Sequence, residues 1–202
     1  MALGHYQQTS ETIANSLLMG GFRMGYAASA AAFVASVGTV LGIGNLTGFT
    51  ENVELMTTQA GNSNKPDKKI VKQTVTVTFE LLEFSTPKFA AIRGGSADTS
   101  ATTSSTYIGG TPTANIFSTG GLRNLTDVAF CFENTTKVGT TTTTTILVVY
   151  KAKMEQGLAF TPKSDNDTDP AMVIPFTVTG ECDTARTAGD QLYKIESQLG
   201  QA

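Results

Sequence analysis

The amino-acid sequence predicts a mainly β protein: a β-sandwich or β-barrel domain with a long hairpin, one short helix and an N-terminal arm. Three features indicate this class. One segment alternates apolar and polar residues strictly, β-favouring threonine is abundant, and clusters of turn-forming residues separate the apolar segments. A chain of 202 residues is long enough for one domain with a substantial hydrophobic core.

The strictest alternation lies in VKQTVTVTFELLEFS, residues 71–85. Successive side chains of a strand point to opposite faces, so this segment predicts a strand that is buried on one side. The other face is neither apolar enough for a core nor charged enough for an ordinary surface. The apolar face carries Val75, Val77, Phe79 and Leu81, and the polar face carries Thr74, Thr76, Thr78 and Glu80.

The composition argues against several classes of function. Charged residues make up only 15% of the chain and the formal net charge is -3, whereas a nucleic-acid-binding protein needs a clustered basic surface. His5 is the single histidine, so we expect no metal site. Cys131 and Cys182 lie far apart in the sequence. Two free thiols in a reducing compartment are the favoured interpretation, and one disulfide is the alternative.

The chain is expected to begin with an N-terminal arm over residues 1–21, in which ETIANSLLMGG forms a short helix ending at Gly20 and Gly21. Residues 22–202 are expected to form a single β domain. Residues 24–41 contain many small residues and few strongly apolar ones, which favours a segment packed against protein over a membrane span. The sequence leaves open whether that segment is a helix or a strand.

The long hairpin is expected to pair the alternating strand with GNLTGFTENVELMT. Glu51 falls among the apolar positions, which predicts a bulge or an exposed strand start. Turn-forming residues and lysines follow, so residues 57–69 are expected to form a projecting basic loop. The strand is expected to place Phe49, Val53 and Leu55 on its core face and Thr50, Asn52 and Glu54 on the opposite face.

The second half of the chain predicts a helix and further strands. Ser85 can cap a short helix that has Pro87 in its first turn. Residues 96–121 are low in complexity and are expected to form a long polar loop. The strands LTDVAFCFENTT and TTTTTTILVVYKAKM are expected to meet at a turn over TKVG, and AMVIPFTVTGECD and GDQLYKIES to form a closing pair. Inward-facing positions are expected at Val128, Phe130 and Phe132.

No residue set in the sequence suggests an enzyme. There is no Ser–His or Cys–His pair, and the glycine-rich GIGNLTG runs into a strand instead of opening a helix. Glu80 and Glu83 would point to opposite faces of a strand, which does not suit a catalytic pair. We therefore expect a non-enzymatic protein without a cofactor.

The order of these parts resembles the major tail tube proteins of long-tailed bacteriophages. The resemblance rests on GNLTGFTENVEL, a polar loop, VTVTFELLEFS, the helix TPKFAAIRGG, and the late strands VIPFTVTGECD and QLYKIES, and it runs from about Gly44 to Ser197. Proteins of this family, like the related tubes of contractile tails and type VI secretion systems, are β-sandwich or β-barrel subunits. They form hexameric rings that stack into a hollow tube through which DNA is ejected.

The resemblance implies a structural protein of the virion tail that assembles in the host cytoplasm. Its implied partners are further copies of itself, a tape measure protein, a tail tip or baseplate and a tail terminator, with double-stranded DNA in passage and no membrane. The polar face of the hairpin would line the channel, because lysines there would hold DNA by its phosphates. The loop would contact the next ring at its acidic residues Asp165, Asp167 and Asp169. The implied channel-lining residues are Thr50, Asn52, Glu54, Thr74, Thr76, Thr78 and Glu80, and the ring-stacking residues are Asn62, Asn64, Lys65, Asp67, Lys68 and Lys69.

A second interpretation is a β-sandwich decoration protein of a phage, or a receptor- or carbohydrate-binding module. Such a module would use exposed aromatic rings to stack on sugars. The chain has no tryptophan, and Tyr107 and Phe117 are the aromatic residues of its long polar loop, which counts against this interpretation. For the threonine face alone, the simplest alternative is an ordinary solvent-exposed sheet face.

Overall fold

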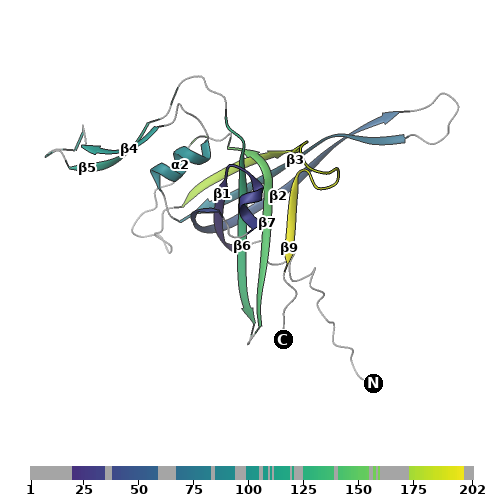
Figure 1. The fold of residues 1–202 in the computed structure, drawn as a ribbon, viewed down its shortest axis with the longest axis horizontal. Coiled ribbons are helices and arrows are strands. Elements are labelled where there is room, and N and C mark those ends of the chain that lie inside the picture. The colour runs from purple at the N-terminus through teal and green to yellow at the C-terminus, as the bar shows by residue number, and fades with distance from the viewer. Residues whose placement is uncertain are drawn as a thin grey trace.

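A computed structural model of the chain describes residues 20–34, 38–58, 67–82, 85–93, 99–104, 107–108, 110, 112–118, 120, 125–138, 141–154, 157, 159 and 173–197. The described chain is mainly β with one short α-helix, so the predicted fold class is confirmed (Figure 1). Its elements are β1 (Gly20–Ala27), the 3-10 helix η1 (Ala30–Val34), β2 (Thr39–Thr58), β3 (Asp67–Leu81), α2 (Thr86–Arg93), β4 (Thr99–Ser104), β5 (Thr113–Ser118), β6 (Val128–Val138), β7 (Thr141–Lys153), β8 (Ile174–Glu181) and β9 (Tyr193–Ser197).

The main sheet closes into a barrel. Antiparallel pairs join β6, β1, β2, β3, β8 and β7 in that order, and β7 pairs again with β6. Closure removes the free edges that an open sheet would present. The predicted closing pair of β8 and β9 is wrong, because both strands lie end to end along one edge of β7. There β8 pairs with Ala152 and Lys153, and β9 pairs with the stretch from Thr145 to Val149.

Aromatic side chains fill the barrel. Phe79 is fully buried at the centre, with ring centroids 5.3 Å from Phe132, 5.4 Å from Phe176 and 6.3 Å from Phe130. Helix α2 adds Phe89, whose ring lies 5.7 Å from Phe176. The predicted inward faces of β3 and β6 are confirmed, with Val75, Val77, Phe79, Leu81, Val128, Phe130 and Phe132 all buried.

The small-residue segment that follows β1 packs on the barrel. It forms the 3-10 helix η1, which contacts β1, β6 and β7, and then enters β2. Ala129 and Cys131, on the outward positions of β6, are therefore buried as well. Gly38, with φ of 73°, makes the turn into β2, where a Cβ atom would lie 2.7 Å from both Phe33 and the carbonyl of Tyr26. No helix among the described residues is long and apolar enough to cross a membrane.

Several predicted boundaries differ from the structure. Gly20 and Gly21 belong to β1, paired with β2, so the arm ends earlier than residue 21; residues 1–19 lie outside the described residues. The TKVG turn is wrong, because β6 continues to Val138 and β7 begins at Thr141. The long polar loop over 96–121 contains the paired strands β4 and β5. Threonine is frequent in the last two of these regions. Its β-branched side chain favours strands even where composition suggests a loop.

The paired strands of the hairpin are also longer than predicted. Residues 57–58 continue β2 and residues 67–69 begin β3, so these positions, predicted in the loop, belong to the strands; residues 59–66 lie outside the described residues. The predicted bulge at Glu51 is wrong: Glu51 pairs regularly with Val75, and the register shifts occur between Leu46 and Gly48 and between Glu54 and Leu55. The hairpin projects far beyond the barrel (Figure 1).

Candidate assembly surface

The projecting part of the hairpin, residues 53–58 of β2 and 67–73 of β3, is called the ribbon below. Strand β1 pairs with β2 only up to Leu46, and β8 pairs with β3 only from Thr74 onward. Within the described residues, each strand of the ribbon therefore has a partner on one side only. Both outer edges present unpaired backbone donors and acceptors, which natural proteins normally cover.

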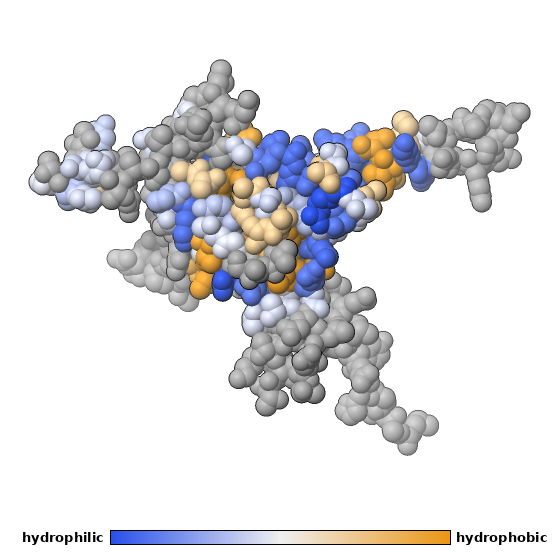
Figure 2. Space-filling model, viewed as in Figure 1, coloured by the Kyte–Doolittle hydropathy of each residue, from blue (hydrophilic) through white to orange (hydrophobic). Residues whose placement is uncertain are grey.

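The ribbon exposes apolar side chains that the barrel does not cover. Val53 is 45% exposed and Leu55 is 50% exposed, whereas Phe49, nearer the barrel, packs against the core. The prediction that all three would pack in the subunit's own core is therefore wrong for Val53 and Leu55, because β8 ends before it reaches them. Figure 2 shows apolar surface on the ribbon between hydrophilic patches. The exposed apolar residues of the ribbon are Val53, Leu55, Met56, Ile70 and Val71.

The charges of the ribbon differ between its strands. β2 contributes Glu54, with Glu51 just before the ribbon, and β3 contributes Asp67 together with Lys68, Lys69 and Lys72. The predicted placement of Lys68 and Lys69 in the loop is wrong, because they lie in β3 opposite Thr57 and Met56, and Asp67 lies opposite Thr58. The ring-stacking role of these three residues stays a prediction. The other predicted stacking residues, Asn62, Asn64 and Lys65, and their expected partners at 165–169, lie outside the described residues.

The predicted channel-lining residues share one face of the hairpin. The register pairs Thr50 with Thr76 and Asn52 with Thr74, and directly paired residues point the same way. Thr78 and Glu80 continue this face along β3 at two-residue intervals. Side chains on the β3 part are half-buried, and those on the β2 part are exposed. The common face is thus present, while its role in lining a channel stays a prediction.

Sequence reasoning missed that the same face continues onto β8. Thr177 pairs with Thr78, Thr179 with Thr76, and Glu181 with Thr74. The segment IPFTVTGE alternates buried and half-buried residues as β3 does, so the same pattern could have identified these threonines. The result is a broad polar face over three strands.

Sequence reasoning also missed Lys72, which lies on the polar face of the hairpin. Its position corrects the expectation that lysines avoid this face. Its register partner is Glu54, so the lysine and the carboxylate lie on the same face as Asn52 and Thr74. These residues, with Val53, line a shallow hollow of about 310 Å³. The predicted strand over residues 71–85 already contained Lys72, two residues before Thr74, so its two-residue period could have placed this lysine on the polar face.

The base of the ribbon is joined to the end of the chain by polar contacts. Tyr193 Oη donates a hydrogen bond to Glu51 Oε2 at 2.9 Å, and Gln73 Nε2 donates to Glu51 Oε1 at 3.1 Å. The Tyr193 ring meets Phe49 edge-on at 5.0 Å. Burial, and then the hydrogen bond to Glu51, raise the pKa of Tyr193 above its ordinary value. Glu51 thus interrupts the apolar row of β2 where the barrel ends.

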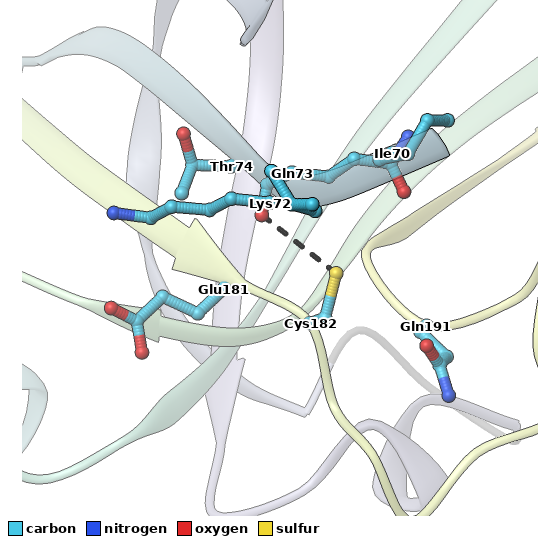
Figure 3. A pocket seen from close by; sticks show the side chains of 8 residues that line it. Ile70, Lys72, Gln73, Thr74, Glu181, Cys182 and Gln191 are labelled. Carbon is cyan, nitrogen blue, oxygen red and sulfur yellow. Dashed lines mark hydrogen bonds between the residues drawn. The ribbon is translucent and has the colours of Figure 1, made fainter. Parts of the chain in front are cut away.

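A groove of about 470 Å³ runs along the open edge of β3 (Figure 3). The Cys182 thiol donates to the carbonyl oxygen of Gln73 at 3.7 Å, at the point where β8 leaves β3. Beyond this contact the edge of β3 faces open space, with Lys72 on one side and Gln191 across the groove. The groove is therefore a place where another strand can add to β3.

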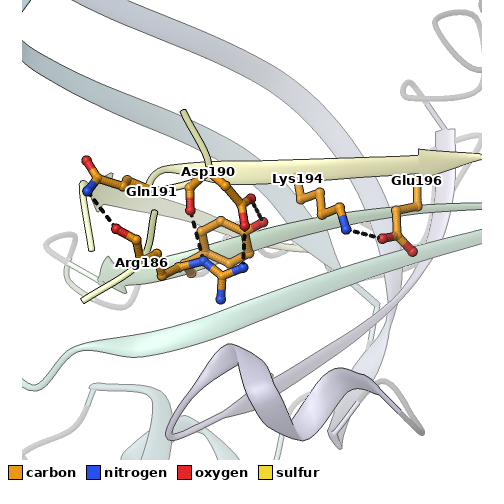
Figure 4. Close-up of polar contacts among 6 residues, drawn as sticks. Arg186, Asp190, Gln191, Lys194 and Glu196 are labelled. Carbon is orange, nitrogen blue, oxygen red and sulfur yellow. Dashed lines mark hydrogen bonds and ion pairs between the residues drawn. The ribbon is translucent and has the colours of Figure 1, made fainter. Parts of the chain in front are cut away.

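The segment between β8 and β9 is fixed onto β7 (Figure 4). Asp190 accepts hydrogen bonds from Tyr150 Oη and from Arg186 Nη2, the latter at 2.6 Å. The Arg186 guanidinium lies 3.7 Å from the centre of the Tyr150 ring. Burial, and then the hydrogen bond to Asp190, raise the pKa of Tyr150 to about 12. In β9 itself, Lys194 pairs with Glu196 at 2.6 Å.

Ion pairs reinforce the short seam between β7 and β8. Lys153 Nζ lies 3.4 Å from Asp127 Oδ1 and 3.7 Å from Glu181 Oε2, and both carboxylates raise its pKa, Asp127 more than Glu181. Lys151 pairs with the other oxygen of Asp127 at 3.2 Å. These side chains are partly exposed, so the pairs contribute modestly to stability.

The described residues contain no cluster of three or more His, Cys, Asp or Glu side chains that could hold a metal ion. Both cysteines are free, as the favoured interpretation predicted. Cys131 is buried, and burial raises the pKa of its thiol to about 12, with a further contribution from Glu133. A thiol held protonated in this way is a poor nucleophile.

The chain resembles a solved structure but matches no family model. No family model and no curated protein sequence matches the chain. Among solved structures, the chain is similar to the tube-terminating cap of the anti-feeding prophage, determined by cryo-EM. The identity is 10%, the TM-score is 0.41, and the match covers 98% of this chain and 95% of that chain. At this level of similarity, the function has to be argued from the residues of this chain.

Proposed function

We propose that this protein is the structural subunit of a phage tail tube, in which hexameric rings stack into a hollow conduit for DNA ejection. The observation that carries the proposal is the ribbon, whose two outer edges are unpaired within the described residues. A barrel that leaves a long hairpin uncovered gains stability when further copies cover it. The number of copies in the ring comes from the resemblance to tail tube proteins and not from the geometry.

Exposed apolar residues support assembly through the ribbon. Val53, Leu55 and Ile70 are each about half exposed, although they extend the row that β2 and β3 bury inside the barrel. A single exposed apolar residue is ordinary, but a group on an uncovered hairpin indicates an interaction surface. Neighbouring ribbons around a shared axis would cover these side chains and close the strand edges together.

The polar face over β2, β3 and β8 supports a channel-lining role. Threonines dominate this face, and Glu54, Glu80 and Glu181 share it with Lys72. Each lysine without a nearby carboxylate would add a ring of cations around the duplex, and phosphate contacts of that kind bind DNA strongly and in a salt-dependent way. A hydroxyl-rich, weakly acidic wall would stay hydrated and let DNA pass. The tape measure, tail tip or baseplate and tail terminator remain partners implied by the resemblance.

Electron microscopy of the purified protein tests the proposal. We expect hollow tubes, and we expect Leu55→Asp to abolish them while leaving the circular dichroism spectrum of the monomer unchanged. Ile43→Asp is the matched control, because Ile43 is also an exposed apolar residue of β2, 57% exposed, but lies in the barrel and not in the ribbon. A wild-type protein that stays monomeric at high concentration, or tubes formed equally well by Leu55→Asp, would contradict the proposal.

A further inference from the structure

We infer that Glu51 is a positioning residue, which fixes the direction of the ribbon relative to the barrel before copies of the chain assemble. The side chains of Glu51, Gln73 and Tyr193 are called the latch below. The consequence for assembly rests on the proposed function, because a ribbon already held in the assembling direction loses less conformational freedom when copies meet. The latch itself belongs to the single subunit and can be tested without tubes.

Strand pairing alone does not fix the direction of the ribbon. Both β1 and β8 leave the hairpin before the ribbon begins, so the ribbon is two-stranded within the described residues, and an isolated two-stranded hairpin is only marginally stable. The register of β2 against β3 shifts between Leu46 and Gly48. It shifts again between Glu54 and Leu55. Irregularities of this kind bend a strand, and Glu51 lies between the two of them.

Glu51 is the point where three strands meet. Its Oε2 accepts a hydrogen bond from Tyr193 Oη of β9 at 2.9 Å, and its Oε1 accepts one from Gln73 Nε2 of β3 at 3.1 Å. Each carboxylate oxygen therefore has a donor, and the two donors lie on different strands. Hydrogen bonds to an ionised carboxylate are stronger than bonds between neutral groups. The carboxylate is thus held in one place between β3 and β9.

The barrel in turn holds Tyr193. Leu192 is buried in the core, and its carbonyl accepts a hydrogen bond from the Tyr150 N–H at 3.3 Å. Tyr193 itself pairs with Val149 of β7. The contacts of Asp190 fix the preceding segment on β7 (Figure 4). A continuous set of contacts therefore runs from β7 through Tyr193 to the base of the ribbon.

A carboxylate suits this position better than another apolar side chain would. Glu51 shares its face of β2 with Phe49 and Val53, so an apolar residue would simply continue the row. Apolar contact has no preferred direction, whereas a hydrogen bond is strong only over a narrow range of angles. Two hydrogen bonds at the junction, next to the edge-on contact of Phe49 with the Tyr193 ring, can therefore fix an angle.

The distance between two spin labels tests the inference in dilute monomer. Met56→Cys places one label in the ribbon, at a residue that is 46% exposed, and Lys151→Cys places the other on β7. Cys182→Ser removes the partly exposed native thiol and keeps a donor for the carbonyl of Gln73, while the thiol of Cys131 is buried. With the latch intact, we expect one narrow distribution of label distances.

Three variants of the latch are compared in this labelled protein. Tyr193→Phe removes one donor and Glu51→Ala removes both acceptors, so we expect each to broaden the distribution of label distances. Glu51→Gln removes only the charge, because its amide oxygen can accept from Gln73 and its amide N–H can donate to Tyr193 Oη. We expect Glu51→Gln to keep the narrow distribution, as a positioning hydrogen bond requires and a purely ionic role would not.

The matched control is Glu196→Ala. It removes a carboxylate of β9 that pairs with Lys194 at 2.6 Å, and it should leave the distribution of label distances unchanged. Circular dichroism verifies the folding of each variant, and Tyr193→Phe carries the test if Glu51→Ala does not fold. A narrow distribution in folded Tyr193→Phe or Glu51→Ala, or a broad one in Glu51→Gln, would overturn the inference.

Assembly gives the second measurement. Tyr193→Phe should raise the protein concentration needed for tubes about two- to tenfold, the size expected from one hydrogen bond per subunit, and leave the tube diameter unchanged. An unchanged assembly concentration would overturn the link between the latch and assembly. If wild type forms no tubes, the proposed function fails, whereas the label distances still decide whether Glu51 positions the ribbon.

Discussion

Tyr193 donates a 2.9 Å hydrogen bond to Glu51, and this contact joins the last described strand to the base of the ribbon. The two residues are 142 positions apart in the sequence. Because Phe49 meets the Tyr193 ring in the same place, β9 holds the hairpin where it leaves the barrel. The direction of the ribbon therefore depends on a strand that lies outside the closed barrel.

The first prediction concerns this contact. Tyr193→Phe removes the hydroxyl and keeps the ring against Phe49, so we expect a loss of about 0.5–1.5 kcal/mol in the free energy of unfolding, the usual net value of one hydrogen bond. Urea denaturation measures this loss. Tyr107→Phe is the control, because Tyr107 is 98% exposed and should change nothing. Equal stability of wild type and Tyr193→Phe would show that the contact does not hold β9 in solution.

The second prediction is a loss of stability in alkali. The folded protein holds the pKa of Tyr150 at about 12, above the ordinary value of 10.0, and the pKa of Tyr193 is raised as well. Between the ordinary pKa of a group and its higher pKa in the folded protein, the unfolded chain has released a proton that the folded chain retains. The free energy of unfolding therefore falls as pH rises through this range. The pKa of the buried Cys131 thiol is raised in the same way, from an ordinary value of 9.0 to about 12. We therefore expect the urea midpoint to be steady below about pH 9 and to decrease from there to about pH 12. In Tyr150→Phe this decrease should be smaller. An equally steep decrease of the urea midpoint with pH would contradict the contribution of Tyr150.

The third prediction concerns the close approach of β2 and β3 at Gly44. A Cβ atom on Gly44 would lie 1.9 Å from the carbonyl oxygen of Glu80, which is backbone and cannot turn aside. We expect Gly44→Ala to destabilise the barrel by about 1–3 kcal/mol or more, as overpacking does. Gly21→Ala is the control, because the nearest atom to its Cβ would be Asn45 Oδ1 at 4.0 Å. Differential scanning calorimetry measures the melting temperatures of both variants. Similar melting temperatures for Gly44→Ala and Gly21→Ala would contradict the prediction.

The elements with a regular period were predictable from the sequence. The alternation in β3 identified its buried and half-buried faces correctly, and the capping pattern identified α2, in which Phe89 N–H bonds to the carbonyl of Ser85 at 2.9 Å. In both cases the period and the flanking residues agree, so local pattern and tertiary burial give the same answer.

The features that failed depend on contacts between distant segments. No pattern in the neighbouring sequence shows that β8 ends before the level of Val53 and Leu55. These residues were therefore expected in the core, whereas the structure exposes them. The partner of Glu51 is Tyr193, which no spacing rule connects to it. The threonine tract before Ile146 was predicted correctly as a strand, because it runs directly into apolar strand residues. The stretch 96–121 was assigned to a loop, although it contains β4 and β5, because composition does not show whether a neighbouring strand is present to pair with it.

The fourth prediction separates folding from assembly. Phe79→Ala opens a cavity among three aromatic rings and should cost about 3–5 kcal/mol in the free energy of unfolding. Leu55→Ala, at a residue that is 50% exposed, should stay within about 0.5 kcal/mol of wild type. Urea titration of dilute monomer measures both. The proposal expects Leu55→Ala, but not a surface variant such as Tyr107→Ala, to raise the protein concentration needed for assembly.

The fifth prediction concerns the polar face. Thr76 lies at its centre, paired with Thr50 on one side and Thr179 on the other, and all three are neutral. Thr76→Lys would place one cation per subunit on this face, and six in a hexameric ring. If the face lines the channel, assembled Thr76→Lys tubes should retain DNA more strongly than wild-type tubes, with a steeper dependence of binding on salt. Filter binding of short duplexes to tubes at several salt concentrations measures the slope.

The matched variant for this test is Lys88→Thr, which removes a cation in α2, away from the polar face. It should leave both DNA retention and its salt dependence as in wild type. A Thr76→Lys tube with the same salt slope as wild type would place the threonine face away from the DNA. In that case the face is an ordinary exposed surface of the barrel, and the ribbon's role in closing the ring would stand without the channel-lining role. The two roles therefore have separate tests, because one depends on the edges of the hairpin and the other on its polar face.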